Sequence, residues 1–351
     1  MRIMKYSKVL KRDIDEIIAD RMLFDPLKGA SILVTGATGL IGSMLVRTLH
    51  AADLKYDLGI GTKALVRNED KARSIFGDML KVGRTELCSN SYGVFTHIIH
   101  AASPTASRYF VEHPVETIRY SVNSTSEILE AARKDCAKVV YISSMEEYGI
   151  PYVAGETMTE DRIGIIDHLN VRSCYPESKR LCECLCASYA LEYGVDVKIA
   201  RLAQTYGAGA PLTDNRMPMQ FARAAASGTD IELHTEGRSL INSVYLADAV
   251  KGILTILNDG DAGEAYNICN DDNTRSVRDI AELISSEVCG GGIAVRVMIP
   301  EGQTGFAPDS SMYLSSQKLK ALGWEPVVDL AEGYKRLTEY IRECEGSNGI
   351  R

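Results

Sequence analysis

The sequence contains no run of basic residues and no long apolar segment in its 351 residues. The formal net charge is −8, from 39 Lys and Arg against 47 Asp and Glu, so we do not expect nucleic acid to be a partner. No apolar run approaches the roughly 18 residues of a membrane-spanning helix, and no membrane segment is predicted. Binding of an anionic substrate would require a local positive patch or helix N-termini, because the net negative charge of the protein repels anions.

The N-terminal segment is charged throughout and lacks the apolar stretch of a secretory signal peptide. Residues 1–29 are predicted to form a helical extension ahead of the first strand. Nine irregularly spaced cysteines favour a reducing, cytoplasmic location. Cys182, Cys184 and Cys186 alternate along a predicted helix, where a spacing of two splays side chains apart. Because no histidine accompanies them, we interpret them as packing residues and predict no metal site.

From residue 31 onward, short apolar runs alternate with helical periods. Strands are predicted at 31–36, 62–67, 94–102, 138–144 and 195–202, and long helices at 40–50, 111–134 and 175–193. This alternation predicts an α/β fold with a Rossmann-type, doubly wound parallel sheet. After residue 203 glycine, proline and asparagine become frequent, which indicates a smaller mixed α/β C-terminal lobe. We assign 30–203 to the dinucleotide domain, which also receives about 240–260, and 204–345 to an interleaved substrate-binding lobe.

A glycine-rich turn, TGATGLIG, lies between the first predicted strand and its helix. Gly36 allows a tight turn, Gly39 lets the backbone approach a pyrophosphate, and Gly42 lets helix and strand pack closely. The helix N-terminus adds N–H donors and a positive dipole end. An ordinary glycine-rich turn is the alternative, but the position between strand and helix matches a dinucleotide site. The predicted cofactor contacts of this turn are Gly36, Thr38, Gly39, Leu40, Ile41 and Gly42.

The second predicted strand ends at Arg67, where NAD-binding folds usually place an acidic residue for the ribose 2′-hydroxyl. An arginine could instead pair with a 2′-phosphate, so this position favours NADP over NAD. A solvated arginine at a strand end is the alternative.

Tyr175 and Lys179 are four residues apart on a predicted helix and therefore share one face. A tyrosine is a poor base at its ordinary pKa near ~10, and a nearby ammonium group favours the phenolate. Ser144, at the end of a predicted strand, supplies a hydroxyl that can orient the substrate oxygen. The pair alone could be a surface feature of an amphipathic helix, but the order of glycine turn, Ser144 and Tyr175–Lys179 makes a catalytic set the better interpretation.

This combination resembles the extended short-chain dehydrogenase/reductases, the nucleotide-sugar epimerases and dehydratases, over residues 30–340. Within that family the chain is most similar to the UDP-glucuronate decarboxylases. The segments that carry the likeness are HAASP (100–104), SSMEEYG (143–149), RSCYPESKR (172–180), RLAQTYG (201–207), DNR (214–216) and LGWEP (322–326).

The resemblance implies a bound nicotinamide cofactor, with NAD more usual than NADP, and transient oxidation of the sugar at C4. Tyr175 would be the base, and Lys179 would also hold the cofactor. Glu146 is implied to be catalytic, because dehydratases and decarboxylases carry a glutamate two residues after the hydroxyl. Dehydratases commonly place an acid where this chain has Met145, and a thioether cannot donate a proton. Decarboxylation is therefore favoured.

Further positions follow from the same resemblance. Ala101 is expected at the cofactor, and the substrate is expected to contact Ser103, Gln204, Arg216 and His234. A homodimer is implied, built from the helices at 111–134 and 175–193.

Three positions depart from the family pattern. Ile241 stands where the decarboxylases carry an arginine, which Arg238 could replace, and Gln204 stands where an asparagine is frequent. An acid that often meets the adenine is not visible within 78–93. Glu147 occupies a usually apolar position, and we interpret it as a solvated or salt-bridged side chain.

Three other functions stay open beside decarboxylation. They are a nucleotide-sugar 4-epimerase or 4-keto reductase, a 4,6-dehydratase, and an inactive dinucleotide-binding regulator.

Overall fold

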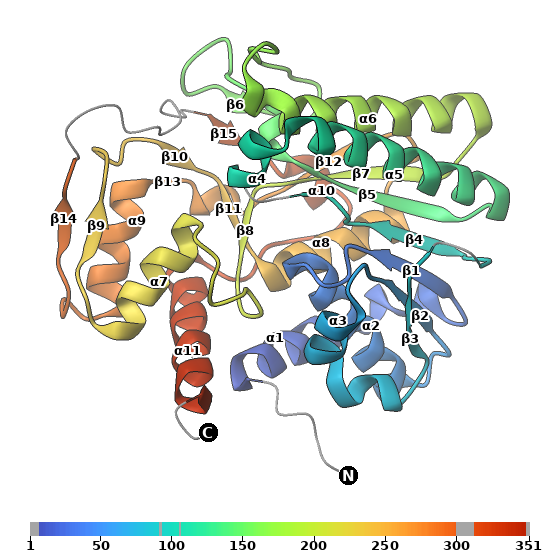
Figure 1. Cartoon of the computed structure of the whole chain (residues 1–351), viewed down its shortest axis with the longest axis horizontal. Coiled ribbons are helices and arrows are strands. Elements are labelled where there is room, and N and C mark those ends of the chain that lie inside the picture. The colour runs from blue at the N-terminus through green and yellow to red at the C-terminus, as the bar shows by residue number, and fades with distance from the viewer. Residues whose placement is uncertain (1–6, 91–92, 105–106, 300–311, 349–351) are drawn as a thin grey trace.

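A seven-stranded parallel sheet forms the centre of the molecule in a computed structural model that describes residues 7–90, 93–104, 107–299 and 312–348 (Figure 1). The strand order is β12-β7-β5-β4-β1-β2-β3, and every neighbouring pair is parallel. The strands are β1 (Ser31–Thr35), β2 (Gly61–Leu65), β3 (Thr85–Cys88), β4 (His97–His100), β5 (Lys138–Ser144), β7 (Val197–Leu202) and β12 (Ala265–Ile268). The predicted Rossmann-type fold is confirmed.

Both faces of the sheet are covered by helices, as a parallel sheet requires. Apolar side chains of α2 (Leu40–Tyr56) and α8 (Leu246–Asp259) pack in the core on one face. Residues of α5 (Pro114–Asp135) and α6 (Cys174–Tyr193) pack on the other. Strand β5 shows this burial on both faces. Successive residues of a strand point to opposite faces, and Val139 to Ser143 are all buried.

The strand order reverses between β1 and β4. From β1 the chain moves outward to β2 and β3, and it returns through β4 to build the other half of the sheet. Such a switch point leaves a crevice at the carboxyl ends of the strands, where doubly wound folds bind their ligands. The glycine turn after β1 and the HAASP segment after β4 both lie at this point.

A smaller lobe of short strand pairs and helices follows the sheet (Figure 1). Its pairs are β8 (Gln204–Tyr206) with β11 (Ser243–Tyr245), β9 (Ile231–Leu233) with β14 (Val295–Val297), β10 (Leu240–Ile241) with β13 (Arg275–Ser276), and β15 (Tyr313–Leu314) with β6 (Thr157–Met158). Its helices are α7 (Met217–Ser227), α9 (Val277–Leu283), α10 (Gln317–Lys320) and α11 (Leu330–Asn348). Helices α3 (Glu69–Phe76) and α4 (Ser107–Glu112) follow β2 and β4 in the chain.

The N-terminal helix α1 (Lys8–Ala19) packs against α2, α8 and α11. Its apolar side, including Ile14 and Ile17, is buried in the main core. Buried Asp13 accepts a hydrogen bond from the Tyr245 hydroxyl at 2.7 Å and pairs with Arg336 at 2.9 Å. The predicted extension is therefore part of the core; its residues 1–6 lie outside the described residues, as do residues 300–311 of the predicted lobe.

Two sheet strands were not anticipated from the sequence. Strand β3 lies within residues 78–93, where no strand was predicted, and β12 comes from a segment assigned to the C-terminal lobe. Among the described residues, no helix is long and apolar enough to cross a membrane.

Candidate active site

The glycine turn has the geometry that its sequence predicts. Gly36 has φ +62°, and an added Cβ there would lie 2.5 Å from the Ala101 carbonyl oxygen. At Gly42 an added Cβ would lie 2.3 Å from the Gly36 carbonyl oxygen, so only glycine lets α2 approach β1. Gly39 is the N-cap of α2 and makes no side-chain capping bond. The first N–H groups of a 17-residue helix therefore remain available for an anion.

A groove of about 2280 Å³ runs along the switch point. The predicted cofactor residues that line it are Gly36, Thr38, Gly39, Leu40, Ile41, Gly42, Arg67 and Ala101. Arg67 comes two residues after β2, and its guanidinium carbon lies 5.1 Å from the centre of the Tyr120 ring. All eight positions thus face one continuous cavity, as a dinucleotide site demands.

The predicted catalytic side chains come from β5 and α6. Ser144 ends β5, and its hydroxyl accepts a hydrogen bond from the Glu146 backbone N–H at 3.2 Å. Tyr175 and Lys179 lie on the first turns of α6, where the Lys179 ammonium donates to the Ile142 carbonyl at 2.8 Å. This bond ties the catalytic helix to the strand that ends in Ser144.

Tyr175 and Lys179 are almost completely buried, with 7% and 3% of their surfaces exposed. The Tyr175 ring stacks on Phe110 of α4, with ring centres 4.4 Å apart. Neither residue, nor Ser144, is among those that line the groove. No sequence signal had pointed to Phe110 as the cover of this tyrosine.

Burial governs the ionisation of the pair. It raises the pKa of Tyr175 well above its ordinary value; Glu146 raises that pKa further, while Ser144 and Arg216 lower it. Burial lowers the pKa of Lys179 to about 8, against the opposing effects of Cys182 and Glu183. The Lys179 nitrogen lies 5.7 Å from the centre of the Tyr175 ring. An additional positive charge next to the phenol would therefore help the phenolate to form.

Glu146 belongs to the short turn η4 (Met145–Tyr148) that follows Ser144. Its carboxylate lies 3.9 Å from the Arg172 guanidinium, and 42% of its side chain is exposed. Burial nevertheless raises the pKa of Glu146, since the surrounding protein displaces part of its water, while Arg172 and Lys179 lower it. A carboxyl group with a raised pKa can hold a proton and release it to a substrate.

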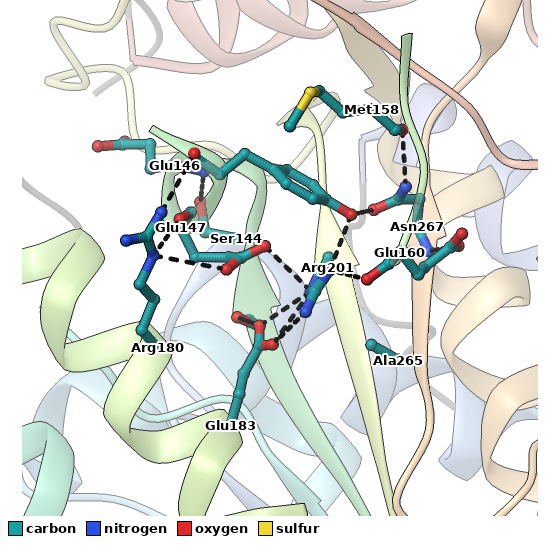
Figure 2. Close-up of polar contacts among 12 residues, drawn as sticks. Ser144, Glu146, Glu147, Met158, Glu160, Arg180, Glu183, Arg201, Ala265 and Asn267 are labelled. Carbon is teal, nitrogen blue, oxygen red and sulfur yellow. Dashed lines mark hydrogen bonds and ion pairs between the residues drawn. The ribbon is translucent and has the colours of Figure 1, made fainter. Parts of the chain in front are cut away.

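Glu147, the next residue, points away from Glu146 into a buried charge cluster (Figure 2). Its carboxylate lies 3.2 Å from Arg201, which also pairs with Glu183 at 2.7 Å. Arg180 lies 3.9 Å from Glu147 and donates to the backbone carbonyls of Glu147 and Tyr148. Burial and the charge of Glu183 raise the pKa of Glu147 to about 7, although both arginines lower it. Of the two alternatives predicted for Glu147, solvated or salt-bridged, the structure shows the salt-bridged one, and the cluster fixes η4 against α6.

Only some of the predicted substrate residues line the groove. Ser103 and Arg216 line the groove, and Arg216 is held by Asp214 through a bond of 2.7 Å. Gln204 begins β8, and its side-chain oxygen is buried without a hydrogen-bond partner. His234 follows β9 and lies 3.3 Å from the Met298 carbonyl oxygen, outside the lining of the groove. Their substrate contacts stay predictions.

The position of Ile241 has an arginine directly opposite. In the antiparallel pair β10–β13, Ile241 faces Arg275, and opposite residues of such a pair project to the same side. Arg275, which sequence reasoning overlooked, is therefore a further arginine beside Ile241, in addition to the predicted Arg238.

Comparison with known proteins connects this geometry to a family. The model of the NAD dependent epimerase/dehydratase family matches residues 32–269. The chain is 29% identical over 314 residues to UDP-glucuronic acid decarboxylase 6 of Arabidopsis thaliana, covering 89% of this chain and 88% of that protein. The match spans more than half of the chain. The protein belongs to the NAD dependent epimerase/dehydratase family.

Solved structures support the fold of this epimerase/dehydratase protein. UDP-glucuronic acid 4-epimerase from Bacillus cereus, in complex with UDP-glucuronic acid and NAD, superposes with a TM-score of 0.74 at 18% identity, covering 90% of this chain and 99% of that one. RMD from Pseudomonas aeruginosa, complexed with NADPH, superposes with a TM-score of 0.68 at 19% identity, covering 90% and 98%.

The residues present fit the nicotinamide dinucleotide that this family uses. An added Cβ on Gly39 would lie 3.2 Å from the Gly36 carbonyl oxygen, so the turn is already tight without a side chain. The uncapped start of α2 can bind the pyrophosphate, and Lys179 with Tyr175 can hold the nicotinamide end. Within the described residues, no three His, Cys, Asp or Glu side chains are arranged to hold a metal ion.

Proposed function

We propose that this epimerase/dehydratase protein is a nucleotide-sugar enzyme that oxidises the sugar C4 hydroxyl transiently and removes the C5 carboxylate as CO2. The observation that carries the proposal is the sequence Ser144-Met145-Glu146 at the end of β5, beside Tyr175 of α6. It offers a hydroxyl and a carboxyl group without the acid that dehydration requires between them. The Arabidopsis relative bears the name of a decarboxylase, in agreement with UDP-glucuronate as substrate.

A nicotinamide dinucleotide, held by the glycine turn and by Tyr175 with Lys179, would supply a reversible hydride acceptor for C4. Tyr175 takes the proton of the C4 hydroxyl, and the Ser144 hydroxyl hydrogen-bonds the same oxygen. The C4 ketone then makes the substrate a β-keto acid. The C5–C6 bond breaks, CO2 leaves, and the electron pair forms the enolate of the ketone.

Glu146 is suited to the next step, which adds a proton at C5. Burial raises the pKa of Glu146, so it holds a proton more readily than an ordinary glutamate, and Arg172 at 3.9 Å stabilises the carboxylate left after transfer. Tyr175 finally returns its proton to the C4 oxygen. Glu146 then regains a proton from solvent, so the net reaction converts a UDP-hexuronate carboxylate and one proton into a UDP-pentose and CO2 without consuming cofactor.

The deciding experiment is mass spectrometry of UDP-glucuronate incubated with the purified protein and added cofactor. A product lighter by one CO2, absent with Tyr175→Phe, is the expected result. An isomer of unchanged mass would instead support 4-epimerisation, the second candidate, which the loss of arginine at Ile241 favours. Unchanged substrate with a protein that binds cofactor would contradict both reactions for this sugar and favour a regulator.

Two further features belong to the proposal. The outer faces of α5 and α6 expose Val115, Ile118, Leu181 and Leu191, which supports a homodimer formed by pairing these helices between two subunits. All nine cysteines carry free thiols, the state expected in a reducing compartment, and we therefore place the enzyme in the cytoplasm.

A further inference from the structure

The adenosine end of the groove carries arginine and lysine where a ribose 2′-hydroxyl would call for a carboxylate. Strand β2 ends at Leu65, and the next residues are Val66, Arg67 and Asn68. The Asn68 side chain is engaged as the N-cap of α3, because it accepts a hydrogen bond from the Lys71 N–H at 2.8 Å. None of residues 66–68 is acidic, and the acids that follow are Glu69, which pairs with Arg73, and Asp70 in the first turn of α3.

Two cations meet at this place. Arg67 and Lys71 both line the groove and both are exposed. Within the described chain neither forms an ion pair, whereas the neighbouring Arg73 is paired with Glu69. An unpaired arginine and lysine on one wall of a cavity create a local positive potential in a molecule whose net charge is −8.

The Arg67 guanidinium is held in position. It lies over the Tyr120 ring of α5, 5.1 Å from the ring centre, an arrangement that orients the guanidinium without using its N–H donors. The acidic residues that line the groove are Asp78, Glu127, Glu130, Asp135 and Asp214, and Asp214 pairs with Arg216. Asp78 pairs with Lys81, and Glu130 pairs with Arg133 and the Tyr189 hydroxyl.

We propose that the groove selects the phosphorylated cofactor NADP(H), and that Arg67 and Lys71 bind its 2′-phosphate. Arginine can donate two parallel hydrogen bonds to phosphate oxygens, and lysine adds a point charge. The ribose 2′-hydroxyl of NAD would find no carboxylate acceptor at this strand end. The proposal does not depend on which sugar reaction the enzyme performs, only on the dinucleotide site of its family.

The test is isothermal titration calorimetry of the full chain, freed of bound nucleotide, with NADP⁺ and NAD⁺ in the absence of any sugar. We expect NADP⁺ to bind at least about 10-fold more tightly. The fragments 2′,5′-ADP and 5′-AMP differ only in the 2′-phosphate and should show the same preference. Higher salt should weaken NADP⁺ binding more than NAD⁺ binding, because the additional contact is ionic.

Variants locate the contact. Arg67→Ala and Lys71→Ala should each weaken NADP⁺ binding several-fold and leave NAD⁺ binding nearly unchanged, and Arg67→Asp should reverse the preference. Arg73→Ala, on the same helix but outside the lining of the groove, is the matched control and should change neither affinity. Equal affinities for the two cofactors, tighter binding of NAD⁺, or an equal effect of Arg67→Ala on both would overturn the proposal. Circular dichroism confirms that each variant is folded.

Discussion

Glu146 differs from its neighbour Glu147 in what surrounds its carboxylate, and the two residues therefore support different predictions. Replacing Glu146 with glutamine keeps the size of the side chain but removes the proton that the proposed mechanism delivers to C5. We expect decarboxylation to slow by about 10²-fold or more, measured as CO2 released from UDP-glucuronate. Cofactor affinity should stay unchanged, and Glu192→Gln, at the exposed end of α6, is the control. A rate equal to that of the unmodified enzyme would contradict the role of Glu146.

Glu147 predicts a dependence of stability on pH. Its pKa in the folded protein, about 7, lies above the ordinary value of 4.5, so folding favours the protonated form. That stability is fully present below pH 4.5 and is lost as the pH rises through about 7. Glu147→Gln mimics the protonated group and should remove this loss, which we place at roughly 1–3 kcal/mol.

The measurement is denaturant unfolding of both proteins at pH 5 and pH 8. We expect the two to differ little at pH 5, with the variant gaining relative stability at pH 8. If the variant instead loses stability relative to the unmodified protein between pH 5 and pH 8, the prediction is wrong. That result would show that the ion pair of ionised Glu147 with Arg201 stabilises the fold.

Residues that follow local rules could be predicted from the sequence, and residues that depend on distant partners could not. The spacing of Tyr175 and Lys179 and the position of Ser144 after a strand follow from helix and strand periodicity. The burial of Glu147 depends on Arg201, 54 positions away and on another strand. Phe110 stacks on Tyr175 from a separate helix, and no local sequence pattern predicts such a contact.

Among the elements, the turn between β1 and α2 is the most tightly constrained. Gly42→Ala would place a methyl group 2.3 Å from the Gly36 carbonyl oxygen, so helix and strand must separate. We expect a loss of about 1–3 kcal/mol in the free energy of unfolding, together with weaker cofactor binding. Gly346→Ala on α11 is the control, because its added methyl group meets no atom within 4 Å. A Gly42→Ala protein as stable as the control would contradict the close approach.

The elements missed from the sequence are short and lie at the two edges of the sheet. Strand β3 has four residues, of which only Thr85 is fully buried, so no apolar run marks it. Strand β12 also has four residues, and one of them is Asn267. Its amide donates to the Met158 and Ser315 carbonyls, so a polar residue is accepted inside the strand because the lobe supplies its partners. Central strands such as β5 were predicted because burial on both faces makes them continuously apolar.

For the whole molecule, the exposed apolar residues of α5 and α6 predict a dimer that single charges can dissociate. Ile118 and Leu181 have 42% and 48% of their surfaces exposed, which suits an interface between subunits. Ile118→Glu and Leu181→Glu should shift the protein from dimer to monomer in sedimentation equilibrium, because each places a charge in an apolar contact. Leu54→Glu, on α2 and 52% exposed, should leave the mass unchanged. A monomeric unmodified protein would contradict the prediction.

The pairing of α1 with α11 has a consequence for how the protein is made. Arg336 binds Asp13 across 323 positions of the chain, so α1 leaves the ribosome long before its partner α11 is made. At roughly 5–20 residues per second this interval is on the order of 20–60 s. Throughout it, the apolar side of α1 that carries Ile14 and Ile17 has only part of its final packing surface. We therefore expect this apolar side of α1 to be incompletely covered on the nascent chain until α11 has been made.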